Sequence, residues 1–166
     1  MESTAERGTP RDEQRAPASD VLRVQSRRFG SFEIPSLSVL HVPQGLVGLP
    51  DLRRYVILDH RPGSPFKWLL SIDDPELAFA VANPDDLVAD YEAPLELAAR
   101  LLGTDPAEIA LFVIVTIPSN PTRMTVNLMA PVVVDLRTRR ARQIVLDDPR
   151  CPPDYLVVRP SVATPA

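Results

Sequence analysis

Residues 124–148 constrain the fold of this chain more than any other part of it. They read MTVNLMAPVVVDLRTRRARQIVLDD and are rich in β-branched and aliphatic side chains on both sides of an arginine-rich stretch. Such residues suit a pleated, half-buried surface, so the pattern predicts a long strand, a basic turn and a second strand through residues 144–146. Pro131 falls inside the first strand, and proline has no N–H group to donate to a sheet ladder. We therefore expect an edge strand, or a bulge at Pro131, in a hairpin that presents a surface and holds no reaction centre.

Short apolar runs broken by prolines predict that the rest of the chain is also mainly β. The chain has 166 residues, enough for one domain with a core, and it contains nineteen prolines against six glycines. The apolar runs predict strands at residues 21–26, 29–34, 39–42, 55–59, 66–71 and 77–82, and a central strand at residues 110–117.

One segment departs from this pattern and predicts a short helix. Apolar side chains recur at the spacing of one helix face, at Leu95, Ala98, Ala99 and Leu102. Pro94 suits the first turn, and Gly103 suits the position just after the last turn. Residues 105–108 predict one further turn, so we expect one or two short helices.

The two ends of the chain have few residues that could build a core. Residues 1–20 carry eight charged side chains, which predicts a disordered N-terminal tail, and residues 159–166 predict a flexible C-terminal tail. A single domain remains at residues 21–158. No apolar run approaches the ~20 residues of a membrane span, and residues 1–20 do not resemble a secretory signal. Cys151 is the only cysteine, which fits a reducing cytoplasm.

The charge balance bears on the class of partner. Net charge is −4 and the isoelectric point is about 5.2. Nucleic acid binding requires a basic field, so we expect no direct nucleic acid partner. An acidic protein is compatible with a basic protein partner.

Asp73, Asp74 and Glu76 place three carboxylates in one predicted turn. They could form a divalent-metal site or an acid–base pair, which would make the chain a small acidic metal-binding or hydrolase domain. They could also be a solvated turn, or an acidic patch that faces a basic protein. A calcium loop would need further alternating ligands and a glycine, which are missing. No nucleophile or histidine has an evident activating partner, so we assign no catalytic residue, metal ligand or cofactor.

The basic turn of the hairpin also has two readings. Arg137, Arg139, Arg140 and Arg142 crowd its tip. They could be a solvated tip, or they could hold an acidic partner.

Six segments that follow one another over residues 28–148 resemble the flagellar assembly factor FliW family. They are RFGSFEIP, HVPQGLVGLPDLRRYVIL, FKWLLSIDDPELAFAVANP, DYEAPLELAARLLG, IALFVIVTIP and TVNLMAPVVVDLRTRRARQIVLDD. No single motif is a catalytic fingerprint, but the succession is specific. The resemblance implies a small, barrel-like antiparallel β domain without enzymatic activity. It also implies a cytoplasmic protein that binds flagellin and the translational repressor CsrA, and so couples flagellin synthesis to filament assembly. We expect the protein to be a monomer.

The chain departs from the family pattern in three places, of which one is the proline-rich N-terminal extension that the family core lacks. Ala141 stands where relatives usually have a glycine in the hairpin turn, which puts a positive φ there in doubt. The proline-rich ending after Asp148 also differs, so contacts of the family's ending cannot be carried over.

Two candidate partner surfaces follow from charge and from the broken strand. For CsrA, a basic protein, the candidates are the acidic turn of Asp73, Asp74 and Glu76, supported by Asn127. For flagellin, whose amphipathic helices could lie in an apolar groove, the candidates are Leu128, Met129 and Val133 beside Pro131. The alternative, that these last three side chains belong to the core, stays open.

Overall fold

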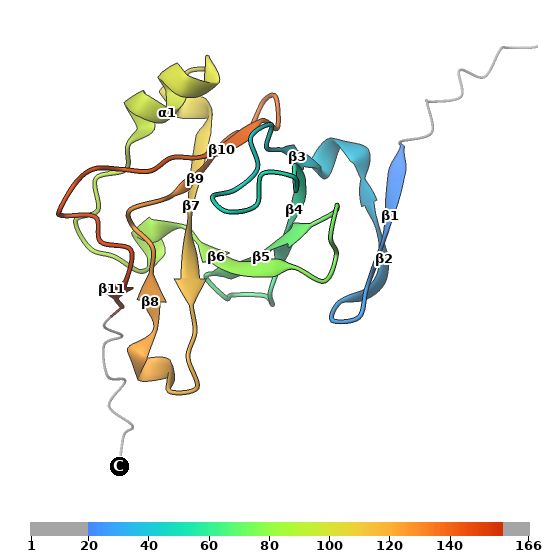
Figure 1. Cartoon of the computed structure of the whole chain (residues 1–166), viewed down its shortest axis with the longest axis horizontal. Coiled ribbons are helices and arrows are strands. Elements are labelled where there is room, and N and C mark those ends of the chain that lie inside the picture. Colours follow the sequence, from blue (N-terminus) through green and yellow to red (C-terminus); the bar gives the residue numbers. More distant parts are fainter. Residues whose placement is uncertain (1–19, 158–166) are drawn as a thin grey trace, which may run out of the picture.

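The computed structural model describes residues 20–157, so the two predicted tails lie almost entirely outside the described residues. Within that range the protein is mainly β, with one α-helix, as the sequence predicted (Figure 1). No helix of the described residues is long and apolar enough to cross a membrane. The strands are β1 (Val21–Ser26), β2 (Gly30–Pro35), β3 (Leu40–His41), β4 (Arg54–Asp59), β5 (Phe66–Ser71), β6 (Ala78–Ala82), β7 (Ile109–Thr116), β8 (Thr125–Val126), β9 (Val132–Asp135), β10 (Ala141–Gln143) and β11 (Tyr155–Leu156).

One large antiparallel sheet organises the domain. Its strand order is β10-β9-β7-β6-β5-β4-β3, with β8 paired to β7 and β11 paired to β8. The predicted central strand is β7, which pairs with β6, β8 and β9. The sheet curls so that β3 approaches the β9–β10 turn, where the His41 N–H donates to the Arg139 carbonyl at 2.9 Å. Only an isolated bridge joins these edges, so the sheet is barrel-like but does not close with a continuous ladder.

Alternation along β7 divides the apolar side chains between two cores. Leu111, Val113 and Val115 pack against the α-helix and the C-terminal segment. Phe112 and Ile114 point to the opposite face, into the curled sheet. This period of two is the geometry of a strand that is covered on both faces.

The β1–β2 hairpin forms a third layer against the outer face of β4 and β5. Val24 and Ile34 of the hairpin share a core with Val56 and Leu70. The predicted first hairpin is therefore present, with its turn at residues 27–29.

The helix α1 (Leu95–Leu102) confirms the predicted helical segment. Within the helix, Ala98 and Ala99 are buried, whereas Leu95 in the first turn is exposed. Gly103 ends the helix with φ 68°, the left-handed conformation that glycine adopts without steric cost. Single turns of 3-10 helix occur at Ser36–Ser38, Pro84–Asp86, Pro106–Glu108 and Pro121–Arg123.

The hairpin at residues 124–148 is more broken than its sequence predicts. Its first strand is two short strands, β8 and β9, separated by residues 127–131 around Pro131. Of the two predicted alternatives, the edge strand is wrong, because β9 lies between β7 and β10. The interruption predicted at Pro131 is present as this break. The second strand, β10, ends at Gln143. Beyond it, the Ile144 and Leu146 N–H groups still donate to the Pro131 and Met129 carbonyls, although residues 144–146 are not part of a strand.

The hairpin turn does not require a positive φ at Ala141. Ala141 is buried in β10 opposite Val134, and the residue with positive φ is Arg139, at 62°. No glycine is therefore needed at position 141.

Candidate interaction surfaces

The predicted acidic turn joins β5 to β6 and is held together by its own side chains. The Asp74 N–H donates to the Ser71 hydroxyl at 2.9 Å, and the Asp74 carboxylate accepts from the Glu76 N–H at 3.2 Å. These two hydrogen bonds hold the turn in one conformation.

Asp73 ties the acidic turn to the start of β4. Its carboxylate accepts from the Arg53 and Arg54 N–H groups at 2.8 and 2.9 Å, and it pairs with the Arg54 guanidinium at 2.8 Å. Burial alone would raise the pKa of this carboxyl, but these hydrogen bonds outweigh it and hold the pKa below its usual value. Asp73 therefore has a structural role, because it joins the acidic turn to the start of β4.

Glu76 ties the same turn to the β1–β2 hairpin. Its carboxylate accepts from the Arg27 N–H at the hairpin turn at 2.9 Å. Beside this contact the Arg28 guanidinium lies 4.2 Å from the centre of the Trp68 ring, within the range of a cation–π interaction. The hairpin is thus held at its turn by one charge-assisted hydrogen bond, to Glu76, and by the stacking of Arg28 on Trp68.

This geometry gives no support to a metal-binding or hydrolase site at the acidic turn. Two of its three carboxylates already accept hydrogen bonds from neighbouring segments. Across residues 20–157, no three His, Cys, Asp or Glu side chains are grouped so that they could hold a metal ion.

Asn127 shapes the break after β8. Its N–H donates to the Ile114 carbonyl at 2.9 Å, and its side-chain oxygen accepts from the Ala130 N–H at 3.1 Å. Figure 1 shows β8 well separated from the turn between β5 and β6, so the structure does not bring Asn127 together with the acidic turn.

The three apolar candidates beside Pro131 differ in burial. Leu128 and Val133 are 1% and 0% exposed and belong to the core under α1, so the core alternative holds for these two side chains. Met129 is half-buried and keeps some surface that a partner could touch.

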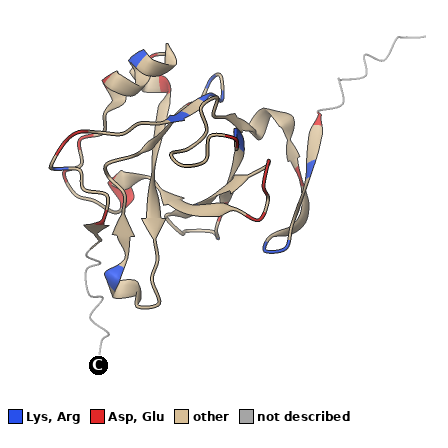
Figure 2. Ribbon diagram, viewed as in Figure 1, with Lys and Arg blue, Asp and Glu red and all other residues tan. Residues whose placement is uncertain are grey.

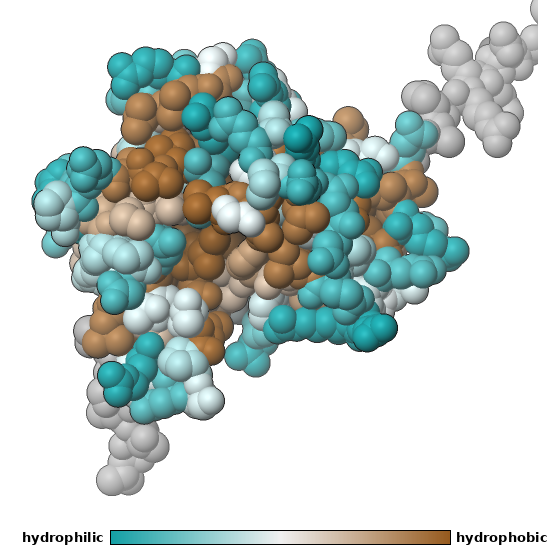
Figure 3. Space-filling model, viewed as in Figure 1, coloured by the Kyte–Doolittle hydropathy of each residue, from teal (hydrophilic) through white to brown (hydrophobic). Residues whose placement is uncertain are grey.

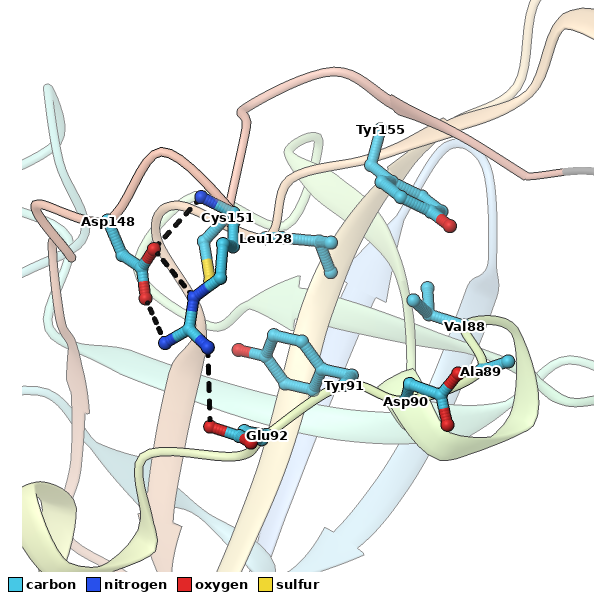
Figure 4. Close-up of a pocket in the computed structure, with 10 residues that line it drawn as sticks. Val88, Ala89, Asp90, Tyr91, Glu92, Leu128, Asp148, Cys151 and Tyr155 are labelled. Carbon is cyan, nitrogen blue, oxygen red and sulfur yellow. Dashed lines mark hydrogen bonds and ion pairs between the residues drawn. The ribbon is translucent and has the colours of Figure 1, made fainter.

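A cavity of about 160 Å³ opens beside Leu128, and no pattern in the sequence predicted it (Figure 4). Residues 88–92 form one wall, and the proline-rich ending forms the other through Cys151 and Tyr155. Arg150 crosses the rim, with its guanidinium 2.9 Å from the Asp148 carboxylate and 3.7 Å from that of Glu92. These walls lie about 60 residues apart in the chain, so no local spacing could have predicted that they meet.

The cavity is suited to binding more than to chemistry. Burial raises the pKa of the Cys151 thiol, which keeps it protonated and a weak nucleophile at neutral pH. Burial likewise raises the pKa of Tyr91 to about 12, and its hydroxyl is buried without a hydrogen-bond partner in the described chain. An apolar floor with an unsatisfied hydroxyl and an ion-paired rim can receive a side chain that carries a polar group.

The arginine-rich turn is held rigidly by a buried acid. The Asp135 carboxylate accepts from the Thr138 hydroxyl at 2.8 Å and from the Arg137 N–H at 3.0 Å. Burial would raise the pKa of this carboxyl, but these bonds lower it, so it stays ionised inside the turn. Figure 2 shows the resulting basic tip between β9 and β10.

Comparisons with known proteins agree on one family. The family model for the FliW protein matches residues 23–157. The flagellar assembly factor FliW of Bdellovibrio bacteriovorus is 43% identical over 129 residues, which cover 75% of this chain and 73% of that protein. That of Caldicellulosiruptor saccharolyticus is 36% identical over 134 residues, which cover 80% of this chain and 88% of that protein.

A solved structure agrees with the fold. The crystal structure of a flagellar assembly factor FliW superposes with a TM-score of 0.74 at 25% identity, and the match covers 84% of this chain and 99% of that one. The family model spans residues 23–157, and these relatives and the solved structure each cover 75% or more of this chain. The chain therefore belongs to the FliW family of flagellar assembly factors.

Proposed function

We propose that this protein acts in the cytoplasm, without enzymatic activity, as a binding protein for flagellin and for the translational repressor CsrA. By antagonising CsrA it would couple flagellin synthesis to filament assembly. The observation that carries the proposal is the family match over residues 23–157, almost the whole described range. Two surfaces of suitable chemistry, one acidic and one apolar, support it.

The acidic turn is the proposed CsrA surface. Of its three carboxylates, Asp74 is the best probe, because within the described residues its carboxylate accepts a single hydrogen bond, of 3.2 Å, from the Glu76 N–H. Asp73 and Glu76 hold other segments, so replacing them would disturb these contacts as well as remove charge. Asn127 stays a separate prediction, since its side-chain NH2 group donates to no other described residue and could donate to a partner.

Asp74→Asn therefore tests the acidic surface without dismantling the turn. We expect slower association with CsrA and a weaker dependence of the association rate on salt, because long-range attraction mainly governs encounter. Glu96→Gln on α1 removes one exposed carboxylate elsewhere and should leave the rate unchanged. Stopped-flow or surface plasmon resonance experiments at several salt concentrations measure the association rate and its dependence on salt. Equal effects of the two variants would remove the acidic turn from the interface.

For flagellin, we propose the surface around Met129 and the cavity beside Leu128. Met129 is half-buried, and Leu128 forms part of the cavity wall although almost none of it is exposed. An apolar helix side chain could fill this cavity while the methionine adapts to the rest of the helix face.

Met129→Glu tests this surface by placing a charge on it. The variant should stay soluble and folded, keep its binding to CsrA and lose most of its binding to flagellin. Val21→Glu is the matched control, because Val21 is 56% exposed and begins β1, which Figure 1 shows far from β8. An insoluble Met129 variant would assign that side chain to the core, and unchanged flagellin binding would rule out this surface.

A further inference from the structure

A second, smaller pocket lies between α1 and the arginine-rich turn. It has a volume of about 60 Å³, several times the ~10–15 Å³ that one water molecule needs. Its lining includes the apolar side chains Leu101, Leu102 and Val42, together with Arg140 and Arg142. The pocket is therefore sized for one aliphatic side chain and bordered by two cations.

Exposed apolar side chains also lie on two of the segments that line the pocket. Leu101 is 41% exposed on α1, and Val47 is 65% exposed on the neighbouring loop. That loop is fastened to β10, because the Val47 N–H donates to the Gln143 side chain at 2.8 Å. Figure 3 shows hydrophobic side chains gathered next to α1 within a polar surround.

The guanidinium groups of the turn have no ion-pair partner in the part of the chain that the structure describes. The ion pairs of residues 20–157 join Arg54 to Asp73, Lys67 to Asp59, and Arg150 to Asp148 and Glu92. None of them includes Arg137, Arg139, Arg140 or Arg142. Four unpaired cations within six residues repel one another in a protein whose net charge is −4.

One residue of the turn also has a left-handed backbone conformation. Arg139 has φ 62°, a conformation that glycine or asparagine adopts more readily. Buried Asp135 holds this conformation through the hydrogen bonds to Arg137 and Thr138. A left-handed residue at this place is common in short hairpin loops, so the turn that carries the arginines has a defined geometry.

We propose that this pocket docks a segment of a partner protein in which a leucine-sized side chain lies beside one or more carboxylates. The aliphatic side chain enters between Leu101 and Val42, and the carboxylates pair with Arg140 and Arg142. Charge complementarity selects an acidic partner here, in contrast to the basic one proposed for the acidic turn. RNA fits less well, because the lining has no aromatic side chain on which a base could stack.

A designed probe tests the proposal on the full-length protein. The probe is a fluorescein-labelled helical peptide with one leucine flanked by glutamates one turn away on each side, measured by fluorescence anisotropy at low salt. Saturable binding is expected, and it should weaken with added salt. Two matched peptides, one with glutamine for glutamate and one with alanine for leucine, should each bind about tenfold more weakly or worse.

Variants of the protein locate the binding. The double variant Arg140→Gln/Arg142→Gln should weaken the glutamate peptide about tenfold or more, and should affect the glutamine peptide little. The control Arg61→Gln/Arg123→Gln removes the same charge from exposed positions outside the pocket and should change affinity less than twofold. Unchanged melting of each variant excludes unfolding as the cause.

Several results would overturn the proposal. They are absence of peptide binding, equal binding of the three peptides, equal effects of the two double variants, and tighter binding of a twelve-nucleotide RNA than of the peptide. Self-association that disappears in Arg140→Gln/Arg142→Gln would assign the surface to a second copy of this chain instead, and would overturn it as well.

Discussion

Gly45 is the position where the structure predicts the sharpest effect of a single added methyl group. Its φ is +67°, and a Cβ built there would lie 2.1 Å from the Leu49 carbonyl oxygen and 2.7 Å from the Pro50 Cα. Both neighbours are backbone atoms, so no side chain can rotate away. Gly48 in the same loop has φ +81° but no heavy atom within 4 Å of its built Cβ. The two glycines therefore separate backbone strain from steric clash.

The expected magnitudes follow from these two geometries. Placing an alanine in the left-handed region costs ~1–2 kcal/mol, and this applies to both positions. At position 45 the loop must also move by about an ångström, with an overpacking cost of ~1–3 kcal/mol. That movement strains the 2.9 Å bond from the Gly45 N–H to the Val42 carbonyl. Gly45→Ala should thus destabilise the protein by ~2–5 kcal/mol, against ~1–2 kcal/mol for Gly48→Ala.

Urea unfolding measures the difference directly. Trp68 is the only tryptophan, so its fluorescence reports on the domain without added labels. The two variants should share the wild-type dependence on urea and differ in midpoint. The smaller entropy of an alanine in the unfolded chain affects both equally and cancels. Equal midpoints for Gly45→Ala and Gly48→Ala would refute the close approach of residue 45 to residues 49–50.

Three further predictions concern the contacts around the acidic turn and the C-terminal ending. The lowered pKa of Asp73 means that its charged form stabilises the fold above the unfolded pKa of ~3.9, and that this contribution disappears as pH falls through the lower folded pKa. Asp73→Asn should therefore be less stable than wild type in urea at pH 7, and the gap should close below about pH 4; a gap independent of pH would contradict this. Glu76→Gln should weaken the bond to the Arg27 N–H and speed amide exchange in β1 and β2 but not in β7, whereas uniform acceleration would argue against a local clamp. Cys151 should react slowly with a maleimide in native protein and rapidly in urea, because it is buried and its pKa is raised; equal rates would place it at the surface.

Much of the strand content was predictable because it follows from local pattern. The alternation in β7, the turn residues around β5 and β6, and the helix with Gly103 behind it all depend on residues within a few positions of one another. The curl of the sheet was expected only from the family resemblance, because it depends on the distant approach of His41 to Arg139.

The candidate surfaces were harder to predict because their contacts are distant in sequence. The roles of Asp73 and Glu76 depend on segments about 20 and 49 residues away, which charge patterning cannot identify. Leu128 and Val133 were uncertain because the break at Pro131 interrupts the alternation that normally separates buried from exposed positions. The cavity beside Leu128 uses an ending that departs from the family pattern, so neither periodicity nor resemblance predicted it.

The proposed function is tested most directly by titrating purified protein with monomeric flagellin and with CsrA from the same host. Isothermal titration calorimetry on full-length chains measures stoichiometry and affinity together. The proposal predicts a 1:1 complex with flagellin, and a complex with CsrA that restores translation of a flagellin reporter repressed by CsrA. Binding to neither protein, at concentrations where the folded state is verified, would contradict it.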